Sequence, residues 1–225
     1  MPKAVRAKPL CRVVVLISGS GSNLQTLING QLAGTLPISI GAVISNHADV
    51  LGLERADTHN IPNHVLAHKD FADRSSFDKD LSRLIDGYQP DLVVLAGFMR
   101  ILTPEFVRHY AGRMLNIHPS LLPKYQGLHT HQRALESNDA IHGVSVHFVT
   151  EELDGGPNII QALVPILKDD DVESLQARVQ AQEHVIYPMA VAWFAEQRLV
   201  MKNDIVLLDS EPLAKEGYQI DSRTS

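Results

Sequence analysis

An asparagine and a histidine two residues apart are the side chains of this sequence best suited to chemistry. Asn116 and His118 lie in the run 114–118 (MLNIH), directly before Pro119. Residues two apart on an extended strand point to the same face, and Pro119 ends that strand. An amide can donate to a developing oxyanion, and an imidazole can move a proton near neutral pH. The pair suits an addition to a carbonyl, although a polar strand end with a hydrogen-bonded core histidine has the same pattern.

A second candidate site is the glycine-serine loop 18–24 (SGSGSNL), which follows a strand-like run and precedes a helical pattern. Glycines let a backbone approach a ligand closely, and free N–H groups at a helix start favour an anion. The loop is neither a P-loop nor a dinucleotide fingerprint, because Leu24 stands where the last glycine would be. No carboxylate occurs before Asp49. We expect a phosphate site; an ordinary turn with an N-cap at Ser22 or Asn23 is the alternative.

Short apolar runs alternate with helical patterns and supply the scaffold for both sites. We predict strands over 12–18, 37–45, 61–67, 91–96 and 114–118, helices over 73–88 and 172–197, and two antiparallel strands over 141–148 and 158–167 around a tight turn. Strands that alternate with helices indicate a parallel sheet whose binding sites lie beyond the carboxyl ends of its strands. The fold class is therefore α/β: a single domain with an open, mostly parallel twisted sheet, an antiparallel edge and flanking helices.

The chain divides into three predicted parts. Residues 1–11 form a basic tail, too short and too polar for a secretory signal. Residues 12–200 form the catalytic domain. Residues 201–225 form a weakly patterned C-terminal extension that we expect to be partly mobile.

Composition excludes several classes of protein. Of 225 residues, 44% are hydrophobic and 20% are charged, which is ordinary globular usage, and no apolar stretch reaches the length of a membrane span. The net charge of −6 argues against bulk nucleic-acid binding, although the first 48 residues carry +4 and the rest −10. One cysteine, Cys11, excludes an internal disulfide and fits a reducing, cytoplasmic setting. Eleven histidines raise the question of metal, but His129 and His131 lack further ligands at a recognised spacing, so we expect no metal.

Five segments together resemble one enzyme family. They are 18–24, 96–102 (AGFMRIL), 116–135 (NIHPSLLPKYQGLHTHQRAL), 142–161 (HGVSVHFVTEELDGGPNIIQ) and 182–188 (QEHVIYP). The chain resembles the formyl-folate transferases, and within them the phosphoribosylglycinamide formyltransferases, over about residues 12–200. The resemblance implies a Rossmann-like formyltransferase fold. The chain departs from the family at Gln126, where proline is common, and in its two terminal extensions.

The resemblance implies a reaction and three central residues. The formyl group of 10-formyltetrahydrofolate, the co-substrate, would move to the amine of the glycinamide ribonucleotide in purine biosynthesis. Asn116 would stabilise the oxyanion, His118 would act as general acid, and Asp154 would orient His118 and favour its charged form. The pair Asp154-Gly155 alone is equally typical of a hairpin turn.

The resemblance also implies binding residues. The phosphate and ribose would be held by Gly21, Ser22, Asn23 and Leu24, together with Glu183. Glu183 falls on the apolar stripe of the 172–197 helix, where a carboxylate needs a partner, either the substrate or a structural hydrogen bond. The folate would contact Asn116, Arg74, Met99, Arg100, Ile101 and Leu102. Without the family, residues 98–102 would be a core-facing loop and Arg74 a solvated charge.

Other functions remain to be separated from this one. A formyltetrahydrofolate hydrolase would use the same three residues with water as acceptor, and a non-catalytic phosphate-binding module would keep the fold alone. The intact Asn116, His118 and Asp154 argue against the module. A transferase acting on initiator tRNA would need a basic surface. We expect small-molecule substrates, no nucleic-acid or membrane partner, and a monomer or weak homodimer.

Overall fold

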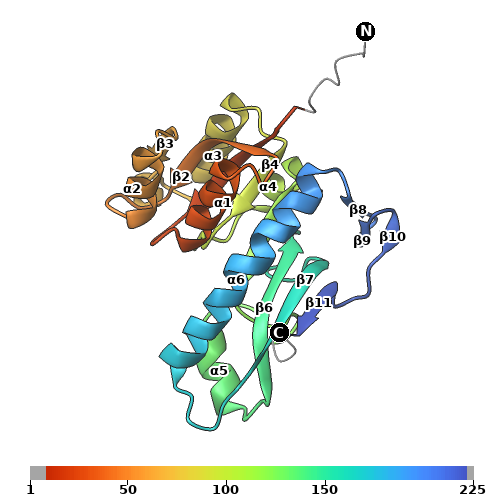
Figure 1. Ribbon diagram of the computed structural model, residues 1–225. Coiled ribbons are helices and arrows are strands. Elements are labelled where there is room, and N and C mark those ends of the chain that lie inside the picture. The colour runs from red at the N-terminus through yellow and green to blue at the C-terminus, as the bar shows by residue number, and fades with distance from the viewer. Residues whose placement is uncertain (1–8, 222–225) are drawn as a thin grey trace.

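An eight-stranded sheet runs through the computed structural model, which describes residues 9–221 (Figure 1). Its strand order is β11-β7-β6-β5-β4-β1-β2-β3, and a second, three-stranded sheet has the order β10-β9-β8. The strands are β1 (Cys11–Ile17), β2 (Ile38–Ser45), β3 (Asn63–Val65), β4 (Leu92–Leu95), β5 (Met114–His118), β6 (Ile141–Phe148), β7 (Asn158–Pro165), β8 (Leu199–Lys202), β9 (Ile205–Leu208), β10 (Glu211–Pro212) and β11 (Tyr218–Asp221). The α-helices are α1 (Ser22–Leu32), α2 (Leu51–Thr58), α3 (Arg74–Gly87), α4 (Pro104–His109), α5 (Thr130–Glu136) and α6 (Val172–Ala195).

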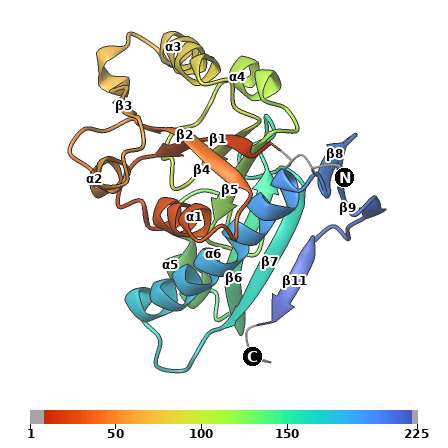
Figure 2. The same cartoon turned by 45° about the horizontal axis from the view of Figure 1, so that its top comes forward.

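The central strands are apolar on both faces because helices cover both faces. Along β1, Val13 and Val15 pack with α1 and α6, whereas Val14 and Leu16 pack with α3. Figure 2 shows α1 and α6 on one side of the sheet and α3 and α4 on the other. A strand buried in this way reads as a continuous β-branched run, as the sequence of β1 does.

The order of the strands determines where a binding site can form. The chain builds outward from β1 through β2 to β3, then returns to the other side of β1 with β4 and β5, all parallel. Strands β6 and β7 then add an antiparallel edge. A crevice forms beyond the carboxyl ends of the strands where the direction of building reverses, between β1 and β4. The predicted fold class is confirmed.

Two details of the hairpin and the C-terminal region differ from expectation. The connection between β6 and β7 spans residues 149–157, so the predicted tight turn is wrong. The weakly patterned C-terminal residues form strands, and β11 pairs in parallel with β7 as an outer strand of the main sheet. The predicted extension at 201–225 therefore contributes directly to the main sheet. Most of the predicted basic tail, residues 1–8, lies outside the described residues.

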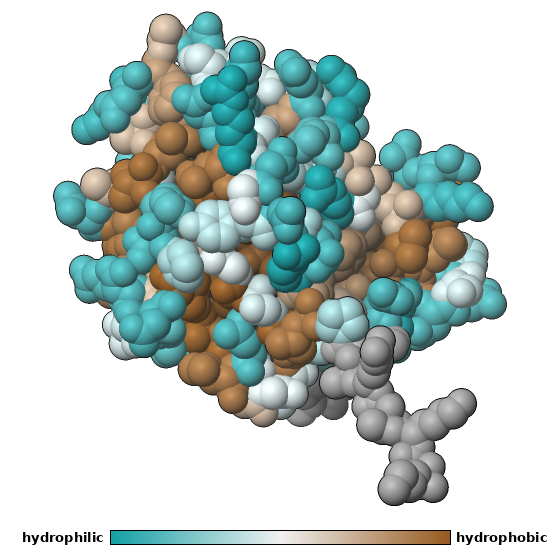
Figure 3. Space-filling model, turned by 90° about the horizontal axis from the view of Figure 1, so that it is seen from above, coloured by the Kyte–Doolittle hydropathy of each residue, from teal (hydrophilic) through white to brown (hydrophobic). Residues whose placement is uncertain are grey.

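The surface is mixed in character. On the face seen in Figure 3, apolar side chains lie between hydrophilic ones, which make up most of the outline. Within residues 9–221, no helix has both the length and the apolar composition needed to span a membrane.

Candidate active site

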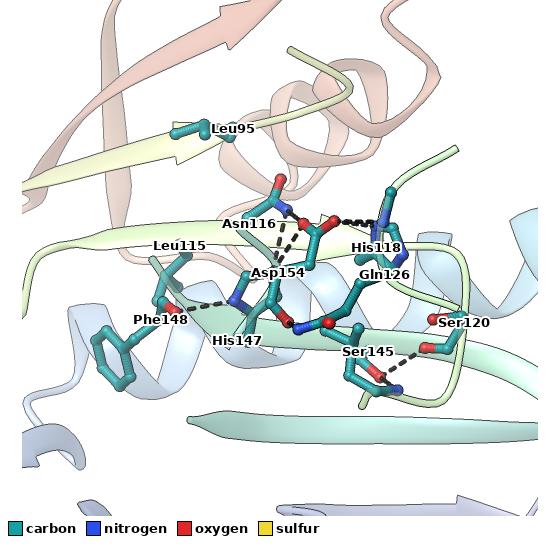
Figure 4. Close-up of polar contacts among 12 residues, drawn as sticks. Leu95, Leu115, Asn116, His118, Ser120, Gln126, Ser145, His147, Phe148 and Asp154 are labelled. Atoms are coloured by element: carbon teal, nitrogen blue, oxygen red, sulfur yellow. Dashed lines mark hydrogen bonds and ion pairs between the residues drawn. The ribbon is translucent and has the colours of Figure 1, made fainter. Parts of the chain in front are cut away.

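Asn116 and His118 lie at the carboxyl end of β5, where the sequence places them. His118 is buried, and its two ring nitrogens face two acceptors, of which Figure 4 shows Asp154. Its Nε2 lies 2.9 Å from the backbone oxygen of Tyr125, and its Nδ1 lies 3.5 Å from Asp154 Oδ2. A carbonyl oxygen only accepts, so Nε2 carries a proton, and a proton on Nδ1 would meet the carboxylate.

Asp154 reaches this pair from the long β6–β7 connection rather than from a hairpin turn. Its backbone is left-handed, with φ of 50°. Oδ2 accepts a hydrogen bond of 3.0 Å from the backbone N–H of Gly127, and Oδ1 lies 3.5 Å from Asn116 Nδ2. A side chain on Gly156 would strike the Phe148 carbonyl oxygen, 1.9 Å from the position of its Cβ. Gly156 is thus needed for the β6–β7 connection to fold back against β6.

His147 is a functional neighbour that the sequence reasoning left without a role. It is the register partner of Asn116 on β6, and its Nε2 lies 3.1 Å from Asn116 Nδ2. Its Nδ1 lies 2.9 Å from the Phe148 carbonyl oxygen, so Nδ1 carries the proton and Nε2 accepts from the amide. Burial lowers the pKa of His147 to about 4, which keeps the ring neutral at pH 7. The available signal was its alternation with Val146 and Phe148 on a predicted strand.

The glycine-serine loop opens onto a cavity of about 290 Å³. Gly21, with φ of 68°, is the N-cap of α1, and no side chain caps that end. The alternative of an ordinary N-cap at Ser22 or Asn23 is therefore absent, and the first amides of α1 lack a side-chain acceptor. Gly21, Ser22 and Asn23 line the cavity, whereas the side chain of Leu24 is fully buried in the core. Leu24 therefore does not line the cavity.

Glu183 lies on the same cavity and has a protein partner. Its Oε2 accepts a hydrogen bond of 2.8 Å from Asn23 Nδ2. Burial raises the pKa of the Glu183 carboxyl, and the Asn23 hydrogen bond offsets part of that effect. The structural hydrogen bond anticipated as the alternative is thus present, in a side chain that also borders the cavity.

The loop after β4 separates this cavity from a second, smaller one. Arg100, Ile101 and Leu102 line the second cavity, of about 100 Å³, together with Asn116 and Asp154. Met99 lies on the first cavity instead; its side chain is 68% exposed, and its N–H donates to Ser18 Oγ at 2.8 Å. Phe98 is buried and the half-buried Leu102 packs against the same core, whereas Met99 and Ile101 are exposed, so the core-facing alternative describes only part of this loop.

Two further predicted residues, besides Leu24, stand apart from the cavity linings. Arg74 is exposed at the first position of α3 and lines neither cavity. His118 also lines neither cavity, but its neighbour Pro119 borders the first and Asp154 the second. The centre formed by Asn116, His118 and Asp154 thus lies where the two cavities approach each other.

The histidines and the cysteine form no metal centre. Within the part of the chain that the structure describes, no group of three or more His, Cys, Asp or Glu side chains is placed to hold a metal ion. His131 Nδ1 lies 3.1 Å from His142 Nε2, a contact between two rings. Burial, helped by the charge of Asp91, raises the pKa of the Cys11 thiol to about 12, so this thiol stays protonated.

Comparison with known proteins identifies the family. The formyl transferase family model matches residues 11–191. A phosphoribosylglycinamide formyltransferase of Escherichia coli is 55% identical over 209 residues, covering 93% of this chain and 99% of that protein. The human trifunctional purine biosynthetic protein adenosine-3 is 45% identical over 184 residues, which cover 82% of this chain and 18% of that protein.

Solved structures agree with these sequence matches. A phosphoribosylglycinamide formyltransferase from Coxiella burnetii superposes with a TM-score of 0.90 at 53% identity, covering 94% of this chain and 99% of that one. A formyltetrahydrofolate deformylase from Pseudomonas syringae superposes with a TM-score of 0.83 at 30% identity, covering 88% of this chain and 66% of that one. On these matches, and with its fold in agreement, the chain belongs to the formyl transferase family.

Proposed function

We propose that this chain transfers the formyl group of 10-formyltetrahydrofolate to the amine of phosphoribosylglycinamide, a step of purine biosynthesis. The observation that carries the proposal is the convergence of Asn116, His118 and Asp154 between two cavities. One cavity has uncapped helix amides suited to a phosphate, and the other has apolar and backbone groups suited to a folate ring. The similarity to proteins named phosphoribosylglycinamide formyltransferase, over nearly their whole length, supports the same substrates.

The amide of Asn116 is arranged to meet the developing oxyanion. One proton of Nδ2 is held by the neutral His147, whereas the other faces Asp154 Oδ1 across a long 3.5 Å contact. Attack of the amine on the formyl carbon places negative charge on the formyl oxygen. As a stronger acceptor, this oxygen can accept a hydrogen bond from the second N–H of Asn116. A single donor of this kind contributes roughly 10²–10³ in rate.

His118 supplies the proton that the departing folate nitrogen needs. When the C–N bond to the folate breaks, N10 gains a proton and the attacking amine loses one. His118 lies between a carbonyl and a carboxylate, so each of its two ring nitrogens has an acceptor within reach. The ring can give a proton to the leaving nitrogen and regain one from the amine, so no net proton is consumed.

The binding residues extend these roles. We propose that the backbone of residues 21–24 and Glu183 hold the ribonucleotide, and that residues 100–102 hold the pterin end of the folate. Arg74, on the outer end of α3, would pair with the glutamate tail, and Met99 would lie between the two ligands. We further propose a cytoplasmic monomer or weak homodimer without a nucleic-acid partner, in keeping with the net charge of −6.

One assay separates this function from its alternatives. The purified chain is mixed with 10-formyltetrahydrofolate, with and without phosphoribosylglycinamide, and deformylated folate is followed by absorbance. We expect turnover only with the ribonucleotide present. Turnover that does not depend on the ribonucleotide would instead indicate a formyltetrahydrofolate hydrolase, and no turnover under either condition would indicate a non-catalytic module.

A further inference from the structure

A row of polar residues crosses four strands of the main sheet and ends at His118. The register pairs His118 of β5 with Ser145 of β6, Ser145 with Gln161 of β7, and Gln161 with Gln219 of β11. Residues directly opposite one another on neighbouring strands place their side chains on the same face of the sheet. The row therefore links the C-terminal strand to the proposed catalytic histidine.

His118, Ser145 and Gln161 are buried although they are polar, whereas Gln219 on the outer strand is exposed. Ser145 is 0% and Gln161 2% exposed. Neighbouring apolar residues of β6 and β7 pack with α6 in the main core. Burying polar groups costs free energy unless each finds a partner, so the partners of Ser145 and Gln161 show what the row does.

Those partners are backbone groups of the loop that follows His118. Gln161 Nε2 donates to the Leu122 carbonyl oxygen and to Ser145 Oγ, both at 2.9 Å. Ser145 Oγ in turn donates to the Ser120 carbonyl oxygen at 2.6 Å and accepts from the Leu122 N–H at 3.0 Å. Figure 4 shows the Ser145–Ser120 contact. Both amide protons of Gln161 are thus used to hold residues 120–122.

The same loop holds the proposed catalytic residues at its other end. The backbone oxygen of Tyr125 contacts His118 Nε2, and the Gly127 N–H donates to Asp154 Oδ2. Ser120 Oγ donates to the Lys124 carbonyl oxygen at 2.6 Å, which couples the anchored part of the loop to the part that touches the site. A change in residues 120–122 is therefore transmitted to both His118 and Asp154.

We propose that Gln161 is a positioning residue for His118, a role that rests on the proposed function. It acts through the loop and touches neither substrate nor reacting atom. Gln219 Nε2 donates to Gln161 Oε1 at 3.3 Å and so fixes the orientation of the amide from β11. Asn158 strengthens the link, since its Nδ2 lies 3.4 Å from the Leu122 oxygen and 3.2 Å from the Lys215 oxygen. The C-terminal strand thereby supports the geometry of the site.

Substitution of Gln161 by methionine, which has similar length and no donors, tests the proposal. We expect Gln161→Met to lower kcat by about tenfold or more, since small misplacements of reacting groups are costly, with both KM values within twofold. Val164→Ala removes packing from the same strand and serves as the matched control; it should leave kcat within twofold. In a His118→Ala background, Gln161→Met should cost less than twofold, because a residue acting through His118 has nothing left to position. An equal loss in both backgrounds would overturn the proposal.

A second readout does not need turnover and so separates this proposal from the proposed function. The ring resonances of His118 are recorded by NMR and assigned by their disappearance in His118→Ala. They should shift in Gln161→Met and stay in place in Val164→Ala; unmoved resonances in a folded Gln161→Met variant would refute the positioning role. If Gln161→Met does not fold, Ser145→Ala, which removes the shared hydroxyl, is measured in both ways with the same criteria.

Discussion

At the scale of single residues, the candidate site depends on which atom carries which proton. The neutral His147 accepts from Asn116 and thereby fixes the direction of the amide, whereas His118 has an acceptor for each ring nitrogen. Two histidines within one site thus take opposite roles because of what surrounds them. His147 faces a carbonyl and an amide in a fully buried position, and His118 faces a carbonyl and a carboxylate.

His118→Ala is the direct check of the general-acid role. We expect kcat to fall by roughly 10²–10⁴, the usual contribution of a positioned proton donor, while the far-ultraviolet circular dichroism spectrum stays unchanged. His109→Ala is the matched control, since His109 is an exposed histidine that pairs with Asp86 on the surface. Turnover of His118→Ala close to that of the wild type would remove His118 from the mechanism.

Glu183→Gln tests the cost of the buried carboxylate. The raised pKa of Glu183 means that the folded chain holds this proton more tightly than the unfolded chain. The stabilisation that comes from the raised pKa of Glu183 is complete below the ordinary pKa of a glutamate. It is lost as the pH rises through the pKa of Glu183 in the folded chain. We therefore expect the variant to unfold at a higher temperature than the wild type at pH 7, and at the same temperature near pH 4.

The same substitution should weaken ribonucleotide binding. A neutral amide can keep the hydrogen bond to Asn23 but presents no charge to the substrate, so we expect the KM for phosphoribosylglycinamide to rise about tenfold. Thermal unfolding and steady-state kinetics measure the two effects separately. If Glu183→Gln is less stable than the wild type at pH 7, then burial of the charged Glu183 carboxylate does not destabilise the fold.

Residue patterns predicted only part of this site. The spacing of Asn116 and His118 was informative because a strand fixes the direction of side chains two residues apart. Asp154 came from the family resemblance, because its left-handed loop position depends on the nine-residue connection folding back on β6. His147 was missed because its role depends on register between strands, which a single sequence does not specify.

At the scale of elements, buried helices and strands hold the loops that we propose bind the substrates. The loop after β4 is fastened at its end by α3, where Asp78 Oδ2 accepts a hydrogen bond of 2.6 Å from the Thr103 N–H. Asp78 is 3% exposed, and burial raises the pKa of its carboxyl, against the effects of Thr103 and of Arg100 and Arg74. A buried carboxylate far from the reacting atoms thus fixes the segment proposed to bind the folate.

Asp78→Ala should loosen that segment without touching the reacting groups. We expect the KM for 10-formyltetrahydrofolate to rise about tenfold and kcat to change less than threefold, because a lost buried hydrogen bond costs about 1–3 kcal/mol. Asp80→Ala, an exposed residue two positions along α3 that pairs with Arg83, is the control. An unchanged KM for the folate would show that the loop is held by its own packing.

The predictability of each element follows its burial. Strands β1, β4 and β5 are buried on two sides and stand out as continuous apolar runs, and α3 and α6 show apolar stripes. The strands β10 and β11 escaped notice because they have two and four residues, with exposed and polar side chains. Their conformation comes from pairing with β9 and β7, which is a tertiary effect that local patterns do not carry.

At the scale of the whole molecule, α6 joins the two halves of the fold. It packs on β6 and β7 and against α1, and it carries Glu183 to the glycine-serine loop. Its first turn is fixed by a capping box of Asp171 and Ser174. Just before it, Asp170 pairs with Arg178 and accepts from the Leu167 N–H at 2.7 Å. The ion pair of Asp170 and Arg178 therefore helps to fix the start of α6.

Acid should weaken the ion pair of Asp170 and Arg178 in a defined range of pH. The Arg178 guanidinium, followed by hydrogen bonds from Leu167 and Ser174, lowers the pKa of Asp170 to about 2. A lowered pKa stabilises the fold above the ordinary value for aspartate, and this stabilisation is lost as the pH falls toward 2. We expect Asp170→Asn to reduce the free energy of unfolding by on the order of 1 kcal/mol at pH 7 and by nothing measurable near pH 2. Asp80→Asn, which removes an exposed ion pair, should match the wild type at every pH in the same urea titrations. A deficit in Asp170→Asn that is constant from pH 7 to pH 2 would mean that the side chain acts through packing and not through its charge.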